Sequence, residues 1–424
     1  MNPRARSERN ADHEALPNPA SRTQLANLDR LSRLMDAAGI DLLIATTPEN
    51  VLYLTSFYSL SHWLIANTEC YVVIARHQLD KPLVVFPKSD SDLVAESGTH
   101  GLSLFPYGSF FIERSPGSDR LTPRDSALAH IIEIDGFETP GAALLAALRS
   151  LRCSAEQIAL DPGRLSGKAR EVVVRFGDSR RSRISEDGGK ILSDARMVKT
   201  PEEILRLSYA ATVTEDAICA VLDNVTIGNS EKDAKRIFQE HLVRHDVEPR
   251  LSVIAFGSHS AYPNGQPGEY KLEEGDIIRF DVGGVFNNYW SDLSRVAIVG
   301  EPTKKMAAVY RALRVGQEEC LSAARPGRTA SEVFEVTMEA VREAGIPDYR
   351  RQHVGHGIGL NIYDPPVLKS GNATVLEPGM LCCIETPYYE AGFGGLQVED
   401  LIEITAAGPR FITQSSREFR QIGN

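Results

Sequence analysis

Two aspartates stand in strand-like contexts within one short stretch, GDIIRFDVGGVFNNYWSDLSRVAIVG, residues 275–300. Asp281 and Asp292 each lie among alternating apolar residues, and two strands joined by a GGVFNN turn would bring them close together. An aspartate inside an apolar strand costs several kcal/mol unless it is hydrogen-bonded, paired or bound to a cation. The pair therefore indicates either structural, hydrogen-bonded acids or part of a metal site.

Two glutamates and a histidine downstream shift the balance toward metal. LCCIETPYYE embeds Glu385 in an apolar run, LQVEDLIEIT embeds Glu399, and RRQHVGHGIGLNIYDPP carries His353 and His356. Three alternating glycines disfavour a helix around these histidines and predict a backbone that passes close to another segment. Carboxylates with one imidazole suit Mn²⁺, Fe²⁺, Co²⁺ or Zn²⁺. Because four carboxylates would repel one another without cations, the set predicts about two divalent ions.

The overall composition fits an enzyme that handles small molecules. The chain has 424 residues, enough for two domains, with 42% hydrophobic and 24% charged residues. Its net charge of -11 argues against a nucleic-acid or anionic-membrane partner. No apolar run approaches the roughly 18 residues of a membrane helix. Six scattered cysteines without a CxxC pair, and no signal peptide, predict reduced thiols in the cytoplasm.

The chain divides into a short polar tail and two domains. Residues 1–22 form the tail, and residues 23–192 alternate helical and strand patterns as in a sheet covered by helices. Within that domain, DLLIATTPENVLYLTSF reads as a buried strand followed by a turn, and residues 107–127 read as a long surface loop. The second domain, residues 193–424, mixes long amphipathic helices with strands. Its first long helix is expected after Thr200, with Pro201 at the first helical position and a capping box closed by Glu203.

The order of the five chemical residues resembles one enzyme family. FDVGG, SDLSR, GHGIGL, IETP and VED each look like a metal-site motif of the pita-bread, M24-type metallopeptidases, which include methionine aminopeptidases, Xaa-Pro aminopeptidases, prolidases and creatinase. GIDLLIATTPENVLYLTSF resembles the opening of a creatinase-type N-terminal domain. Methionine aminopeptidases lack that domain and are disfavoured. The resemblance implies an α/β creatinase-like N-terminal domain and an α+β pita-bread catalytic domain.

The resemblance also assigns roles to the five ligands. Asp281 would bind the first metal, Asp292 and Glu399 would bridge both metals, and His356 and Glu385 would bind the second. A bridging water would be acidified and become the nucleophile, with Glu385 accepting its proton. We expect Mn²⁺, with Fe²⁺, Co²⁺ or Zn²⁺ as alternatives, two ions per subunit, and a homodimer.

Three positions depart from the family pattern. Asn264, in GSHSAYPNGQP, and Tyr363, seven residues after His356, each stand where the peptidases have a histidine near the substrate. Gln397 stands where the family commonly has an arginine. Asn264 and Tyr363 can hydrogen-bond a substrate, but neither can act as an imidazolium near pH 7. Tyr389, four residues after Glu385, matches the family's tyrosine and is a candidate substrate contact, as is His353.

An aromatic cluster in the first domain is a further candidate. Tyr58, His62 and Trp63 follow the YLTSF segment. Such residues usually pack a core, but in related dimers this domain reaches over the partner's active site, so a substrate contact is the second interpretation.

Three functions from different classes compete. The first is a dinuclear metallohydrolase that cleaves an amide bond of a dipeptide or short peptide, such as Xaa-Pro. The second is a pita-bread hydrolase or lyase acting on a small, non-peptide zwitterion. The departures from the family pattern at Asn264 and Tyr363 favour this second function. The third is a metal-free binding protein, which the complete ligand set disfavours.

Overall fold

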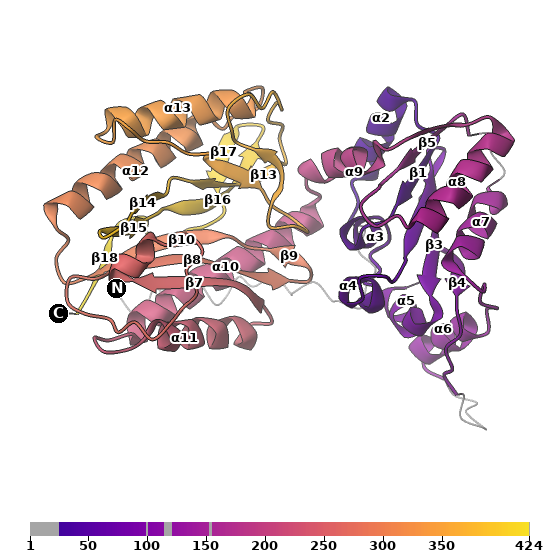
Figure 1. Ribbon diagram of the computed structural model, residues 1–424, viewed down its shortest axis with the longest axis horizontal. Helices are drawn as coiled ribbons and strands as arrows, with labels where there is room; N and C mark the ends of the chain where they lie inside the picture. The colour runs from indigo at the N-terminus through magenta and orange to yellow at the C-terminus, as the bar shows by residue number, and fades with distance from the viewer. Residues whose placement is uncertain (1–24, 99–100, 114–120, 152–154, 424) are drawn as a thin grey trace. The chain divides into compact units, whose positions relative to one another are not determined.

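The computed structural model describes residues 25–98, 101–113, 121–151 and 155–423. The predicted polar tail, residues 1–22, lies outside these ranges. The chain divides into two compact units, Met1–Leu192 and Ser193–Asn424 (Figure 1). Both units combine a sheet with covering helices, so the predicted combination of an α/β and an α+β part is confirmed. Among the described helices, each is too short or too polar to cross a lipid bilayer.

Unit 1 is built on a six-stranded mixed sheet in the order β4-β3-β2-β1-β5-β6. Its strands are β1 (Leu42–Ala45), β2 (Tyr71–Ala75), β3 (Gln78–Pro87), β4 (Ser103–Tyr107), β5 (Gln157–Leu160) and β6 (Arg183–Ser185). Its helices are α2 (Leu28–Ala38), α3 (Pro48–Thr55), α4 (Leu60–Leu64), α5 (Ser91–Ser97), α6 (Pro123–Ile132), α7 (Pro140–Ser150), α8 (Gly167–Arg180) and α9 (Gly188–Met197), which runs across the boundary into unit 2.

Two local expectations for unit 1 were wrong for the same reason. Helix α3 occupies the place of the turn predicted after β1, and α6 begins inside the predicted loop of residues 107–127. Each helix starts with a threonine that caps it, Thr47 or Thr122, followed directly by proline. A capping threonine and a proline at the first position satisfy or remove the backbone donors that a short helix would otherwise expose.

Unit 2 contains a ten-stranded sheet whose main order is β12-β11-β13-β16-β10-β8-β7. Its strands are β7 (Glu248–Phe256), β8 (Ile277–Phe286), β9 (Tyr289–Trp290), β10 (Leu293–Val299), β11 (Gly355–Gly357), β12 (Asp364–Val367), β13 (Leu381–Glu385), β16 (Glu399–Thr405), β17 (Gly408–Phe411) and β18 (Arg420–Ile422). A separate hairpin pairs β14 (Tyr388–Glu390) with β15 (Gly394–Leu396).

Two helix pairs cover opposite sides of this sheet (Figure 1). Helices α10 (Pro201–Asn224) and α11 (Glu231–Arg244) pack on the β7–β8 side, while α12 (Lys304–Ala323) packs beside β13 and against α13 (Ala330–Glu343). The predicted capping box at the start of α10 is present: Thr200 accepts from the Glu203 backbone, and Glu203 accepts from the Thr200 backbone. A helix pair followed by antiparallel strands thus occurs twice, and the site residues come from both halves.

Strand β8 shows how the sheet separates apolar from chemical side chains. Ile278, Phe280 and Val282 point into the apolar core beneath α10 and α11. Because successive side chains of a strand point to opposite faces, Arg279 and Asp281 point together to the other face.

The turn after β8 is tighter than the predicted GGVFNN turn. Only Asn287 and Asn288 form it, both with positive φ, and Gly283 belongs to the strand. A side chain at Gly283 would collide with the carbonyl oxygen of Ser291, so glycine lets the chain segment before Asp292 lie directly against β8.

Candidate metal centre

Five strands deliver the five predicted ligands to one place in unit 2. Asp281 lies on β8, Asp292 immediately precedes β10, and His356 lies on β11. Glu385 ends β13, Glu399 begins β16, and the two are direct cross-strand partners. The strand order therefore brings together residues separated by more than one hundred positions in sequence.

The ligand atoms lie close enough to share metal ions. One carboxylate oxygen from each of Asp281, Asp292 and Glu399 falls within 4.8 Å of the others. His356 Nε2 lies 3.6 Å from Asp292 Oδ2 and 3.9 Å from Glu399 Oε1. The side chains of His356, Glu385, Asp292 and Glu399 are almost fully buried. This donor set suits a divalent ion better than a hydrogen-bonded acid pair.

Unpaired buried atoms provide a direct test of that fit. Among the described residues, Asp292 Oδ1, Glu399 Oε1 and His356 Nε2 are buried and have no hydrogen-bond partner. A buried polar atom without a partner costs about 1–3 kcal/mol, and more when it carries charge. Three such atoms on three predicted ligands fit a cation site, because a bound ion would satisfy all three.

The electrostatics lead to the same inference. Burial, together with neighbouring carboxylates, raises the pKa of Asp292 and Glu399 well above the ordinary range. Burial also raises the pKa of Asp281 to about 6, although Arg279 opposes the shift. Burial lowers the pKa of His356, which favours the neutral imidazole that can bind a metal. A divalent cation would offset the carboxylate repulsion.

Glu385 differs from the other acids because two histidines and an arginine lie around it. His353 Nδ1 lies 3.1 Å from Glu385 Oε1. Burial alone would raise the pKa of Glu385, but His353, His356 and Arg351 hold it below its ordinary value. The structure thus places His353, a predicted substrate contact, beside a predicted metal ligand.

The glycine-rich stretch around His356 is a strand held tightly between two others. Gly355 has a φ of +152°, and a side chain there would collide with the carbonyl oxygen of Cys383 on β13. Cys383 itself faces the cluster, with its sulfur within 4.8 Å of ligand atoms of His356 and Glu399. Burial raises the pKa of this thiol well above its ordinary value, and its sulfur donates to the backbone carbonyl oxygen of Asp292 at 3.6 Å.

The two substituted positions lie differently. The Tyr363 ring stacks on His356 with ring centroids 3.7 Å apart, and Tyr363 is 50% exposed, so its hydroxyl can reach a substrate. Asn264 is exposed on a loop, where its backbone carbonyl accepts a hydrogen bond from Gln266. Of the two, the structure brings only Tyr363 into contact with a predicted ligand.

Sequence reasoning missed two polar neighbours of the site. Arg279 donates to Asp281, and its position two residues away on the same strand face was a usable signal. Asp364 is fully buried and accepts from Arg196 at 2.9 Å, directly after Tyr363 in the chain. That second pairing joins residues 168 positions apart, and no local pattern indicates it.

The predicted aromatic cluster lies in unit 1. Tyr58 and Trp63 stack with centroids 5.8 Å apart, while His62 is fully buried and burial lowers its pKa to about 4. Their role in substrate contact stays a prediction.

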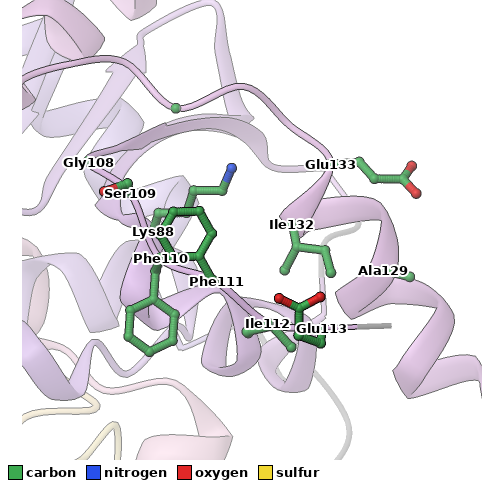
Figure 2. Close-up of a pocket in the computed structure, with 11 residues that line it drawn as sticks. Lys88, Gly108, Ser109, Phe110, Phe111, Ile112, Glu113, Ala129, Ile132 and Glu133 are labelled. Carbon is green, nitrogen blue, oxygen red and sulfur yellow. The ribbon is translucent and has the colours of Figure 1, made fainter. Parts of the chain in front are cut away.

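Unit 1 also holds a cavity of about 520 Å³ beside Phe110, Phe111 and Ile132 (Figure 2). None of the predicted site residues lines this cavity, and its Lys88 ammonium already donates to the carbonyl oxygen of Ile134.

Comparisons with known proteins agree with this geometry. Residues 206–406 match the metallopeptidase family M24. The chain is similar to an Xaa-Pro dipeptidase of Pyrococcus furiosus, with 32% identity over 54% of this chain and 66% of the relative. It is also similar to an Xaa-Pro dipeptidase of Lactobacillus helveticus, with 30% identity over 58% of this chain and 68% of the relative.

Solved structures extend the likeness in fold to nearly the whole chain. The structure of an Xaa-Pro dipeptidase from Bacillus anthracis covers 93% of this chain, and 99% of its own length is matched, with a TM-score of 0.73 at 22% identity. The two-unit architecture with a curled C-terminal sheet is therefore the creatinase-like and pita-bread fold that the sequence predicted. The chain belongs to metallopeptidase family M24.

Proposed function

We propose that this protein is a dinuclear metal-dependent hydrolase that cleaves the amide bond of dipeptides or short peptides of the Xaa-Pro type. The observation that carries the proposal is the convergence of four acids and one histidine with three unpaired, buried ligand atoms. The relatives named Xaa-Pro dipeptidase support the substrate class. Asp281, Asp292, His356, Glu385 and Glu399 would hold the ions.

Bound divalent ions would supply an acidified water as nucleophile and would polarise the substrate carbonyl. Glu385 would accept the proton of that water. His353, 3.1 Å from its carboxylate, would keep Glu385 oriented. The hydroxyl of the half-exposed Tyr363 would donate a hydrogen bond to the substrate, where the peptidases have an imidazole. Asn264 and Tyr389 complete the predicted substrate contacts.

Three finer parts of the proposal rest on the sequence. We infer two Mn²⁺ ions per subunit, because carboxylate-rich sites favour hard ions. We also infer a homodimer and a cytoplasmic location. Light scattering of the purified protein measures its molar mass in solution and so tests the dimer. A monomeric mass at micromolar concentration would contradict the inferred dimer and leave the rest of the proposal unchanged.

The function is tested with Mn²⁺-loaded protein on a panel of Xaa-Pro dipeptides, with the same dipeptides carrying alanine in place of proline as matched substrates. We expect proline release that depends on Mn²⁺ and stops with a chelator. Glu385→Gln should lose turnover and stay folded. Protein that retains bound Mn²⁺ but hydrolyses no member of the panel would refute the peptidase proposal.

A further inference from the structure

Arg279 is the largest fully buried side chain of the described residues, and its guanidinium is completely surrounded by acceptors. All three of its nitrogens donate. Nε donates to the carbonyl oxygen of Ser260 at 2.9 Å, Nη2 to those of Tyr262 at 2.8 Å and Pro263 at 3.1 Å, and Nη1 to Asp281 Oδ2 and Gln397 Oε1, both at 3.1 Å. One cation therefore joins a metal ligand, a neighbouring amide and the loop that carries Asn264.

Gln397 extends this connection to two more ligands. Its Oε1 accepts from Arg279 and also from the Tyr389 hydroxyl at 2.9 Å. With the oxygen occupied twice, the amide nitrogen must face the other way, where it lies 3.3 Å from Glu399 Oε2 and 3.5 Å from Glu385 Oε2. The orientation of the Gln397 amide, and through it of both glutamates, thus depends on Arg279.

We propose that Arg279 is the positioning cation of this metal centre, and that it acts from strand β8 in place of an arginine at the position of Gln397. Arg279 fixes the rotation of the Asp281 carboxylate and fixes the direction in which Gln397 donates. A carboxylate offers about four lone-pair sites, so the hydrogen bond to Oδ2 leaves the others for an ion. The role rests on the proposed metal site, but not on the identity of its substrate.

Charge and orientation make opposite predictions for Arg279. A guanidinium near a cation site repels the ion, so if its charge alone mattered, Arg279→Gln would tighten Mn²⁺ binding. If orientation dominates, the same substitution weakens binding. Changes of groups that orient metal ligands typically cost 10–100-fold in affinity or activity.

The test measures Mn²⁺ binding to chelator-treated full-length protein by calorimetry, with Co²⁺ absorption as a second readout of ligand geometry. We expect Arg279→Gln to weaken Mn²⁺ binding by roughly 10–100-fold. Arg279→Lys keeps the charge but cannot span the same acceptors, so it should also lose at least about tenfold. Lysine is the milder change and decides the question if the glutamine variant does not fold.

A swap separates positioning from a merely structural role. Arg279→Gln combined with Gln397→Arg supplies one guanidinium from the opposite side, and we expect it to recover Mn²⁺ affinity to within about threefold of wild type and to restore the Co²⁺ spectrum. Gln397→Arg alone crowds two cations and should bind Mn²⁺ poorly.

As a matched control, Arg417→Gln removes another arginine that pairs with a buried acid, Asp400, and should lower the melting temperature without changing Mn²⁺ affinity.

Unchanged or tighter Mn²⁺ binding in both Arg279 single variants, or in Arg279→Lys alone if Arg279→Gln does not fold, would overturn the inference. A swap that binds no better than a folded Arg279→Gln would also overturn it. Because only the metal is used as probe, this result is independent of the peptidase test. Wild-type protein that binds Mn²⁺ but cleaves no dipeptide would contradict the proposed function and leave the Arg279 comparison intact.

Discussion

Glu399→Gln should stabilise the metal-free protein and remove at least about half of the stabilisation that Mn²⁺ gives to the wild type. In the wild type, ligand oxygens of Glu399, Asp281 and Asp292 lie within 4.8 Å of one another, where each ionised pair repels by about 3 kcal/mol at an effective dielectric constant of about 20. Protonation of these carboxyl groups lowers the repulsion between them. Glutamine has the same shape, can still accept from Gln397, and can donate to a neighbouring carboxylate.

The size of the effect depends on pH. The pKa of Asp281 is raised to about 6 from 3.8, and burial also raises the pKa values of Asp292 and Glu399 well above their ordinary values. Between the unfolded and folded pKa values the folded protein binds more protons, so metal-free stability falls as pH rises through that window. At pH 8 we expect Glu399→Gln to gain about 2 kcal/mol, or about 4–8 °C in Tm for a domain of this size. The gain should be smaller at pH 5.

Mn²⁺ should cancel most of the stability advantage of the variant at pH 8. At 100 times its dissociation constant a ligand stabilises by about 2.7 kcal/mol, and a variant that binds 10–100-fold more weakly gains only about 0.4–1.4 kcal/mol at the same concentration. Thermal melts of both proteins at pH 5 and pH 8, with and without Mn²⁺, measure Tm under all four conditions. As control, Glu215→Gln changes a buried glutamate that accepts from the backbone nitrogens of Gln414 and Ser415 and pairs with Arg295. This variant should destabilise the protein with no change in its Mn²⁺ response. A metal-free Glu399→Gln protein that melts below wild type at pH 8 would refute the electrostatic reasoning.

Three further predictions address the substrate side and the fold. Tyr363→Phe should lower kcat about tenfold or more through loss of one oriented hydrogen bond, without releasing metal; unchanged kcat in a panel assay would remove Tyr363 from the site. Asn264→His with Tyr363→His restores the family pattern and should raise kcat/KM on Xaa-Pro dipeptides, whereas equal values would mean that neither position sets specificity. Burial raises the pKa of Glu203 to about 7 from 4.5, so its charge costs stability as pH rises through that range; Glu203→Gln should stabilise the protein by up to about 3 kcal/mol at pH 8 and by little at pH 4, and denaturant titrations at both pH values check the sign.

Local signals in the sequence were sufficient for the parts that depend on neighbouring residues. The capping box of Thr200 and Glu203 is formed by residues three apart, and the alternation around Asp281 follows from the period of a strand. The same kind of signal is present at Thr47 and Thr122, but the helices that follow have only 8 and 10 residues, too few for a clear helical period of apolar side chains.

The polar environment of the site required the folded chain. Arg279 reaches Gln397 across 118 positions, and Arg196 reaches Asp364 across 168. Such pairs depend on strand order and not on spacing, so no local pattern in the sequence indicates them. The glutamine at position 397 has its counterpart in Arg279, which donates to it from strand β8.

The central claim is that five residues of this chain hold two divalent ions, and metal stoichiometry tests it most directly. Chelator-treated protein is equilibrated with Mn²⁺, and bound metal is measured per chain by elemental analysis beside the variants Asp292→Asn and Glu399→Gln. We predict two ions per wild-type chain and one or fewer in each variant, because both side chains are assigned as bridging ligands. Less than one ion bound to well-folded wild-type protein, or two ions retained in both variants, would contradict the account.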